Sequence, residues 1–176
     1  MSMAPRRILV VGPSWVGDMV MAQSLFMTLK ARHTLVEIDV LAPGWSLPIL
    51  ARMPEVRRGI AMPLGHGQFG LRTRWQLGRQ LAQDRYDQAI VLPGSFKSAL
   101  APFFAGIPRR TGFRGEMRIG LLNDMRRLDK RALPMTVQRF VALGLPPDTP
   151  QPPPTPTPRL QPDPAGFARL RAQLDL

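Results

Sequence analysis

A short apolar segment, a glycine-lined turn and a long apolar helical pattern follow one another between residues 7 and 29, and this succession most restricts the fold. Ile8–Val11 is wholly apolar after a basic pair, as in a parallel strand covered on both faces. Further strands are expected near Glu37–Leu41, Arg57–Met62 and Ala89–Leu92, with helical stretches between them. This alternation predicts an α/β fold with a doubly wound parallel sheet.

The turn at residues 12–17 places a carboxylate, Asp18, just beyond the carboxyl end of a strand, where open α/β sheets bind their ligands. Its two glycines have the spacing of a P-loop, but Asp18 and Met19 stand where a P-loop needs Lys and then Ser or Thr. The dinucleotide fingerprint GxGxxG fails as well, because Ser14 replaces its second glycine. Both nucleotide-binding motifs are therefore disfavoured.

Two roles remain open for Asp18, and they are compatible. Asp is favoured at helix N-caps, and its charge suits the positive end of the helix dipole. A carboxylate at the rim of a cleft can also take a proton from a sugar hydroxyl as a general base.

Several segments together resemble the ADP-heptose:LPS heptosyltransferases, a resemblance that spans residues 6 to about 145. The segments are GPSWVGDMVMAQSL at 12–25, ARMPEV at 51–56, MPLGHG at 62–67, RYDQAIVLPGSFKSALAPFFAGIPRRTGFRGEMRIGLLND at 85–124 and LDK at 128–130. The resemblance implies the N-terminal Rossmann-like domain of a two-domain GT-B glycosyltransferase. It also implies inverting transfer of heptose from ADP-L-glycero-D-manno-heptose to the first heptose of the Kdo-lipid A inner core, with Asp18 as general base.

Basic residues supply the candidate acceptor site. Residues 109–131 contain eight Lys or Arg against three acids. The segment RRTGFRGEMR is predicted to be a flexible loop whose guanidinium groups bind the phosphates and carboxylates of the acceptor. Lys97, in a first helical turn capped by Ser95, opposes the helix dipole, which favours a surface or anion-binding role. The candidate acceptor-binding residues are Ser14, Trp15, Lys97, Arg109, Arg110, Arg114 and Arg118. Arginine outnumbers lysine 21 to 3 throughout the chain, so a coding bias is the alternative explanation of this basic segment.

No metal or cofactor is expected. The chain lacks a DxD carboxylate pair, and Asp84 with Asp87 are interpreted as solvated charges. His33 and His66 have no spacing that suggests a zinc site.

Two further helices are predicted downstream. Between residues 68 and 84, Leu71, Trp75, Leu77 and Leu81 recur at helical spacing. On this pattern the arginines point elsewhere, to a solvated face; they are Arg72, Arg74, Arg79 and Arg85. Another helix is expected to begin at Pro134 and end at Gly144.

Proline divides the chain. Ten of its twenty prolines fall between Pro146 and Pro164, a composition typical of an extended, stiff spacer. We therefore expect a first domain at 1–145, a linker at 146–164 and a helix at 165–176. The resemblance implies that the first domain is the acceptor side and that the helix leads toward a donor-binding domain. That second domain, which would make most of the contacts to ADP-heptose, is expected to be absent, so the chain is predicted to be truncated and inactive alone. The helix exposes Phe167, Leu170 and Leu174 on one face.

The net charge of +12 leaves two other classes of function open. One is nonspecific nucleic-acid binding, disfavoured because the basic region has a single aromatic residue and no recognised module; no specific nucleic acid is expected. The other is a noncatalytic remnant or interaction module. The absence of cysteine permits a reducing cytoplasm, and neither a signal peptide nor a membrane span is evident. We expect a cytoplasmic protein with peripheral contact at the anionic inner membrane.

Overall fold

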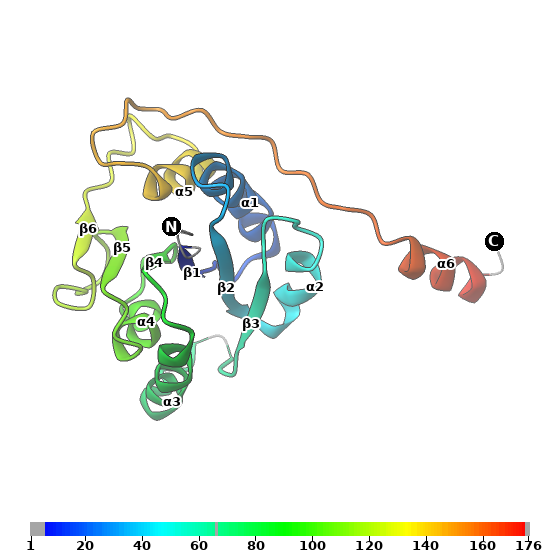
Figure 1. Cartoon of the computed structure of the whole chain (residues 1–176), viewed down its shortest axis with the longest axis horizontal. Helices are drawn as coiled ribbons and strands as arrows, with labels where there is room; N and C mark the ends of the chain where they lie inside the picture. The colour runs from blue at the N-terminus through cyan, green and yellow to red at the C-terminus, as the bar shows by residue number, and fades with distance from the viewer. Residues whose placement is uncertain (1–5, 66, 175–176) are drawn as a thin grey trace, which may run out of the picture.

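The computed structural model describes residues 6–65 and 67–174. Within them, six parallel strands form one sheet in the order β3-β2-β1-β4-β5-β6 (Figure 1). The strands are β1 (Arg7–Val11), β2 (Glu37–Pro43), β3 (Arg58–Met62), β4 (Gln88–Val91), β5 (Arg109–Phe113) and β6 (Asp124–Arg126). This order is that of the Rossmann sheet, and it confirms the predicted fold class.

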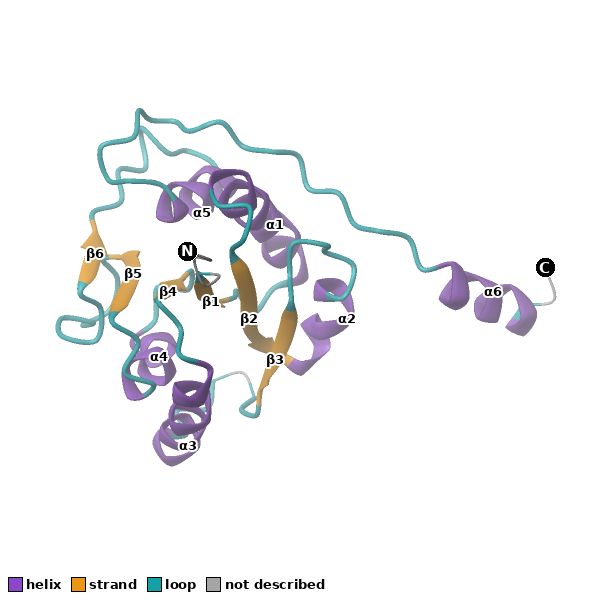
Figure 2. Cartoon of the chain, in the orientation of Figure 1, coloured by secondary structure: helices purple, strands orange, loops and turns teal. Residues whose placement is uncertain are grey.

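Helices cover both faces of the sheet, as Figure 2 shows. On one face lie α1 (Val16–Arg32), α2 (Leu47–Leu50) and α5 (Thr136–Gly144), and on the other lie α3 (Leu71–Leu81) and α4 (Leu100–Phe104). The 3-10 helices η1 (Gly44–Ser46), η2 (Ala82–Asp84) and η3 (Phe96–Ala99) join these elements, and α6 (Pro164–Gln173) comes last.

Alternate residues of β1 explain why its sequence is wholly apolar. Ile8 and Val10 pack into the core under α1 and α5, whereas Leu9 and Val11 pack into the core under α3 and α4. A strand buried on both faces needs apolar side chains at every position. The helix α1 buries Met19 and Phe26 against the first core, as its broad apolar surface predicted.

The first four predicted strands are confirmed, but the prediction of a flexible loop was wrong for residues 109–113. These residues form β5, which pairs with β4 in the register Gln88 to Arg109. Thr111 is buried and its hydroxyl accepts a 2.8 Å hydrogen bond from Gln88 Nε2. This buried polar pair keeps the strand from showing the apolar run by which the other strands were found.

The orientation predicted for α3 was only partly right. Leu77 and Leu81 are buried as predicted, but three other residues do not lie where the pattern placed them. Leu71 and Trp75 are each 49% exposed, whereas Arg74 is only 5% exposed. The helix packs on α4 through Gly78, where a Cβ atom would lie 2.5 Å from Phe104 Cβ. This close contact orients α3 so that its buried face includes Arg74, and Leu71 and Trp75 lie outside that face.

The start of α5 differs by two residues from the prediction. Met135, not the residue before Pro134, is the N-cap, and its N–H donates a 3.0 Å hydrogen bond to Gln138 Oε1. The helix ends at Gly144 as expected.

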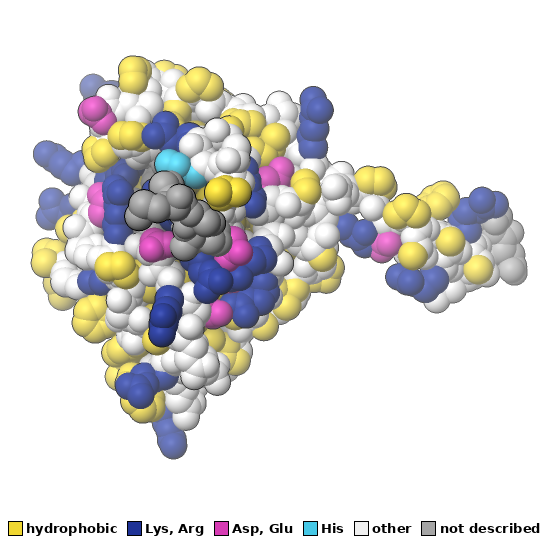
Figure 3. Space-filling view, viewed as in Figure 1, with side chains coloured by type: hydrophobic (Ala, Val, Ile, Leu, Met, Phe, Trp, Pro, Cys, Tyr) yellow, Lys and Arg dark blue, Asp and Glu magenta, His cyan; other side chains and the backbone are white. Residues whose placement is uncertain are grey.

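A buried carboxylate ties β2 to β3 and to the segment before β4. The fully buried Asp39 accepts two hydrogen bonds from Arg57, at 2.9 and 2.6 Å, one from Arg58 at 3.0 Å and one from the Tyr86 hydroxyl at 2.5 Å. Burial alone would raise the pKa of Asp39, but these hydrogen bonds and the charges of both arginines hold it below its ordinary value. Figure 3 shows basic and acidic side chains side by side around the start of β1.

Asp84 keeps a partly exposed side chain, as predicted, but it also forms a 2.9 Å ion pair with Arg58. Asp87 accepts a 2.7 Å hydrogen bond from the Arg7 N–H, at the amino end of the sheet. His33 is the C-cap of α1, and His66 lies outside the described residues.

The proline-rich linker runs extended between α5 and α6 and is fixed to the domain (Figure 1). Gln23 of α1 donates to Arg159 O and accepts from Arg159 N, both at 2.9 Å, and Ser24 Oγ donates to Pro156 O at 2.6 Å. Arg52 forms an ion pair with Asp163, the N-cap of α6. The apolar side chains of α6 and of its C-cap remain exposed, as expected from the sequence, at 64% for Phe167, 52% for Leu170 and 57% for the C-cap Leu174.

None of the helices in the described residues has both the length and the apolar character needed to cross a membrane.

Candidate active site

The chain changes direction between β1 and β4, and the candidate site lies at the carboxyl ends of these two strands. After β1 the chain continues into α1 on one face of the sheet, and after β4 it continues into η3 and α4 on the other. Ligands of open α/β sheets bind at such a switch point. Two cavities open here, and Ser14 and Pro93 line both of them.

The first cavity, which we call the Asp18 cavity, has a volume of about 410 Å³. Asp18 is half-buried in the first turn of α1, and Trp15, not Asp18, is the N-cap. The N-cap interpretation of Asp18 was therefore wrong, although its charge still lies at the favourable end of the helix dipole. Among the described residues, no hydrogen bond or ion pair engages the Asp18 carboxylate.

Arg118 closes one wall of the Asp18 cavity. It is 1% exposed, and its guanidinium donates to Pro93 O at 2.6 Å and to Phe113 O. Its buried Nε has no hydrogen-bond partner among the described residues, and burial lowers the pKa of the group. This predicted acceptor residue therefore also holds together the loops that follow β4 and β5.

Three other predicted residues line the same cavity. Arg114 is exposed, and no hydrogen bond or ion pair in the described part of the chain engages its side chain. Trp15 is 73% exposed, and the half-buried Ser14 accepts a 3.2 Å hydrogen bond from Trp45 Nε1 at its carbonyl oxygen. The structure thus brings Ser14, Trp15, Arg114 and Arg118 together with Asp18.

Arg109 and Arg110 lie elsewhere, at the amino end of β5. Arg109 donates to Asp124 Oδ2 at 2.8 and 3.0 Å. Arg110 donates to the carbonyl oxygens of Ile107 and Leu121, both at 2.6 Å, and lies over the Phe103 ring at 5.5 Å. Parallel strands place this end of the sheet opposite the end that carries Asp18, so the structure does not join these two arginines to the site.

Sequence reasoning missed the contribution of α5 to the Asp18 cavity. Thr136, Arg139 and Phe140 line it, and Arg139 is held by the carbonyl oxygens of Leu133 and Pro134 at 2.9 and 2.8 Å. These residues meet Asp18 only because α5 packs on α1, and no local pattern in the sequence signals that contact.

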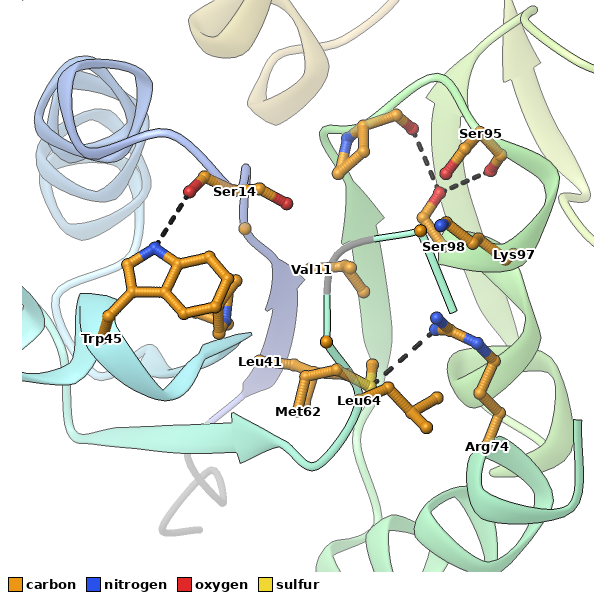
Figure 4. A pocket seen from close by; sticks show the side chains of 16 residues that line it. Val11, Ser14, Leu41, Trp45, Met62, Leu64, Arg74, Ser95, Lys97 and Ser98 are labelled. Carbon is orange, nitrogen blue, oxygen red and sulfur yellow. Dashed lines mark hydrogen bonds between the residues drawn. The ribbon is translucent and has the colours of Figure 1, made fainter. Parts of the chain in front are cut away.

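The second cavity, which we call the Lys97 cavity, has a volume of about 230 Å³. Lys97 of η3 is half-buried there, capped by Ser95 as predicted, although the Ser95 side chain makes no capping hydrogen bond. Figure 4 shows its side chain reaching into the cavity, across from Trp45 and above Arg74. The predicted acceptor residue Lys97 thus belongs to a neighbouring cavity and not to that of Asp18.

A close backbone contact sets the spacing of the two loops that Arg118 joins. A Cβ atom at Gly115 would lie 2.3 Å from Gly94 O, whereas a Cβ atom at Gly94 would meet nothing within 4 Å. We expect Gly115→Ala to lower the free energy of unfolding by about 1–3 kcal/mol, because backbone must move. In the matched control, Gly94→Ala should change it by less than about 0.5 kcal/mol. Urea denaturation measures both, and equal losses would contradict this account.

Comparison with known proteins gives consistent results. Residues 74–175 match the profile of glycosyltransferase family 9 (heptosyltransferase). The chain is similar to lipopolysaccharide heptosyltransferase 2 of Escherichia coli K12, at 62% identity over 138 residues, which cover 78% of this chain and 40% of that protein. It therefore spans less than half the length of this curated relative.

Solved structures agree with this match. The structure of E. coli ADP-heptose LPS heptosyltransferase II superposes with a TM-score of 0.82 at 51% identity, over 97% of this chain and 51% of that chain. A family 9 glycosyltransferase of Veillonella parvula, at 15% identity and a TM-score of 0.76 over 100% of this chain and 52% of that chain, shares the fold. The chain thus belongs to glycosyltransferase family 9, the heptosyltransferases.

Proposed function

We propose that this chain forms the acceptor-side domain of an inverting heptosyltransferase of lipopolysaccharide core biosynthesis. The donor is ADP-L-glycero-D-manno-heptose, bound mostly by a second domain, and the acceptor is the first heptose of the Kdo-lipid A inner core. The high identity to heptosyltransferase 2 proteins supports this substrate class. The cytoplasmic side of the inner membrane is the proposed place of action, since the lipid-anchored acceptor requires peripheral contact there.

The free Asp18 carboxylate is the observation that carries the proposed chemistry. It lies at the switch point of the sheet, in a cavity open to solvent and lined by cationic side chains. Asp18 takes the proton of the acceptor hydroxyl as that oxygen bonds to the anomeric carbon of the donor. The bond between the anomeric carbon and the ADP oxygen breaks in the same step, ADP leaves as an anion, and the configuration inverts.

Cations beside Asp18 suit an acceptor rich in phosphate and carboxylate groups. Arg114 is exposed and unpaired among the described residues, so it can bind an anion directly. Arg118 is fixed by two carbonyl oxygens and shapes the wall. Arg109 and Arg110 are left out of the proposed acceptor site, because their side chains are engaged at the opposite end of β5.

A chimera tests the proposed function directly. Residues 6–145 of this chain replace the matching region of the E. coli relative, which supplies the remaining domain. We expect the chimera to transfer heptose from ADP-heptose to heptosyl-Kdo-lipid A, measured by ADP release and by the mass of the product. A folded chimera without transfer, with the unaltered relative active in parallel, would favour a noncatalytic interaction module.

Removal of the Arg114 guanidinium should affect binding more than chemistry. For Arg114→Ala in the chimera, we expect KM for the acceptor to rise about tenfold, the usual effect of losing a hydrogen bond to a charged group, with kcat within about twofold. Arg79→Ala, an exposed arginine of α3 outside the Asp18 cavity, is the matched control. An unchanged KM for Arg114→Ala would show that this side chain is only solvated.

A further inference from the structure

The Lys97 cavity carries unbalanced positive charge. Two cationic side chains, Arg74 of α3 and Lys97 of η3, line it, and no Asp or Glu is among its described lining residues. The two cations come from different elements and extend into the same space, as Figure 4 shows. The spacing of the apolar residues predicted a solvated Arg74, so the fold alone reveals that Arg74 and Lys97 share a cavity.

Arg74 is buried without a counter-ion in the described part of the chain. Its Nε donates to Phe69 O at 2.7 Å and its Nη2 to Gln68 O at 3.3 Å, but the partner of Nη1 is the thioether sulfur of Met62 at 3.8 Å. A thioether is a weak acceptor. Burial lowers the pKa of this guanidinium, which is the direction expected for a cation that lacks a paired anion. A bound anion would offset the cost of burying this charge.

Lys97 supplies the second cation of the cavity, and the side chains around it form the remaining wall. Among the described residues, no hydrogen bond or ion pair engages the Lys97 ammonium group. Ser98 Oγ is already used, since its single proton lies between two carbonyl oxygens, Ser95 O at 2.6 Å and Pro93 O at 3.2 Å. Apolar side chains form other parts of the wall: Met62 and Leu64 lie beside Arg74, and the Trp45 indole ring lies across the cavity from Lys97. Such a cavity offers charge to an anion and an apolar surface to the carbon atoms that bear it.

We propose that the Lys97 cavity binds a small oxyanion, a carboxylate or a phosphate monoester, carried by the sugar chain whose hydroxyl reacts at Asp18. This proposal rests on the proposed function, because it assigns the second contact of the same acceptor. Ser14 and Pro93 line both cavities, so only the β1–α1 turn and the loop after β4 separate the anion from the reacting hydroxyl. The volume of about 230 Å³ suits one anionic substituent rather than a whole nucleotide.

The three tryptophans allow a direct binding experiment on the 176-residue chain. Trp45 lines the Lys97 cavity, Trp15 lines the Asp18 cavity, and Trp75 is exposed on α3 and lines neither. Their indole N–H signals in a ¹⁵N-labelled protein are followed by NMR during titration with Kdo, a carboxylate sugar, with methyl phosphate, and with neutral methyl mannoside. We expect Kdo, methyl phosphate or both to shift the Trp45 signal in a saturable way, and methyl mannoside to leave it unchanged.

Variants then connect the response to the cations. Lys97→Gln should weaken the anion affinity about tenfold, as expected for loss of a charge-assisted hydrogen bond. Arg74→Gln should act in the same direction, but it also removes contacts to backbone, so Lys97→Gln is the decisive variant. Arg72→Gln, which removes an equal charge from an exposed position of α3, should leave the affinity unchanged.

Four outcomes would overturn the proposal: no response of Trp45, a response of Trp15 alone, an equal response to methyl mannoside, or an affinity unaffected by Lys97→Gln. A response to Kdo alone identifies a carboxylate site, and a response to methyl phosphate alone identifies a phosphate site. Transfer by the chimera is measured separately and depends on Asp18. A failed anion site would therefore leave the proposed function standing, and a failed transfer assay would leave the anion titration readable.

Discussion

Replacement of Asp18 with Asn in the chimera is expected to lower kcat by about 10²–10⁴-fold, the usual contribution of a general base. The amide has nearly the shape of the carboxylate but cannot take the proton of the acceptor hydroxyl. Because no hydrogen bond or ion pair engages Asp18 within the described residues, the substitution should leave the fold intact. Steady-state kinetics give kcat, and acceptor binding measured by calorimetry should be unchanged.

The matched control is Asp87→Asn, at the opposite end of the sheet. Its side-chain oxygen accepts a hydrogen bond from the Arg7 N–H, a role that an amide oxygen can also fill. The control should retain full transfer activity. If Asp18→Asn also retained activity and only lowered the free energy of unfolding, by about 0.3–1 kcal/mol, Asp18 would serve the helix dipole alone.

Loss of the buried carboxylate at Asp39 should have the largest effect on stability. For Asp39→Asn in the 176-residue chain, we expect the free energy of unfolding to fall by about 3 kcal/mol, because Arg57, Arg58 and the Tyr86 hydroxyl lose their shared charged acceptor. The two arginines are partly exposed and can regain water, which keeps the cost at the lower end for a broken buried ion pair. Urea denaturation at neutral pH measures the loss, and Asp87→Asn serves again as control.

The same carboxylate should make stability depend on pH in the acid range. The pKa of Asp39 in the folded chain is below its ordinary value, so the unfolded chain binds the proton first as pH falls. Its contribution is therefore complete above the unfolded pKa of about 3.9 and is lost as pH falls through the lower folded pKa. We expect wild type to lose more stability than Asp39→Asn below about pH 4. Parallel pH profiles of the two proteins would contradict the assignment.

The sequence predicts those parts of the fold in which burial leaves an apolar pattern. β1, β2, β4 and α1 were predicted because both faces of each strand, and the apolar face of the helix, pack into apolar cores. β5 was missed because a polar pair, Thr111 with Gln88, occupies the position where an apolar contact would have revealed it. Arg74 was misplaced because the close contact at Gly78, rather than the apolar pattern, decides which face of α3 is buried.

Some residues of the candidate site follow from the local sequence, and others are brought there only by tertiary contacts. Ser14, Trp15 and Asp18 belong to one turn, so their proximity follows from the local sequence once the strand and helix are predicted. Arg118 joins them only through the carbonyl oxygens of Pro93, in the loop after β4, and Phe113, the last residue of β5. Arg139 joins them only through the packing of α5 on α1. Contacts of this kind depend on tertiary structure, and charge counting could not separate Arg118 from Arg109.

The linker has a consequence for motion, because it is attached to the helix that carries the proposed base. The first turn of α1 holds Asp18, and Gln23 and Ser24, five and six residues later, hold the backbone at Arg159 and Pro156. A pull on the linker therefore acts on α1 close to the turn that carries Asp18, and the linker can swing freely only after these hydrogen bonds break. The first half of α1 therefore anchors the linker and also positions Asp18, the proposed base. A rotation of the linker and a displacement of Asp18 would involve the same rigid helix.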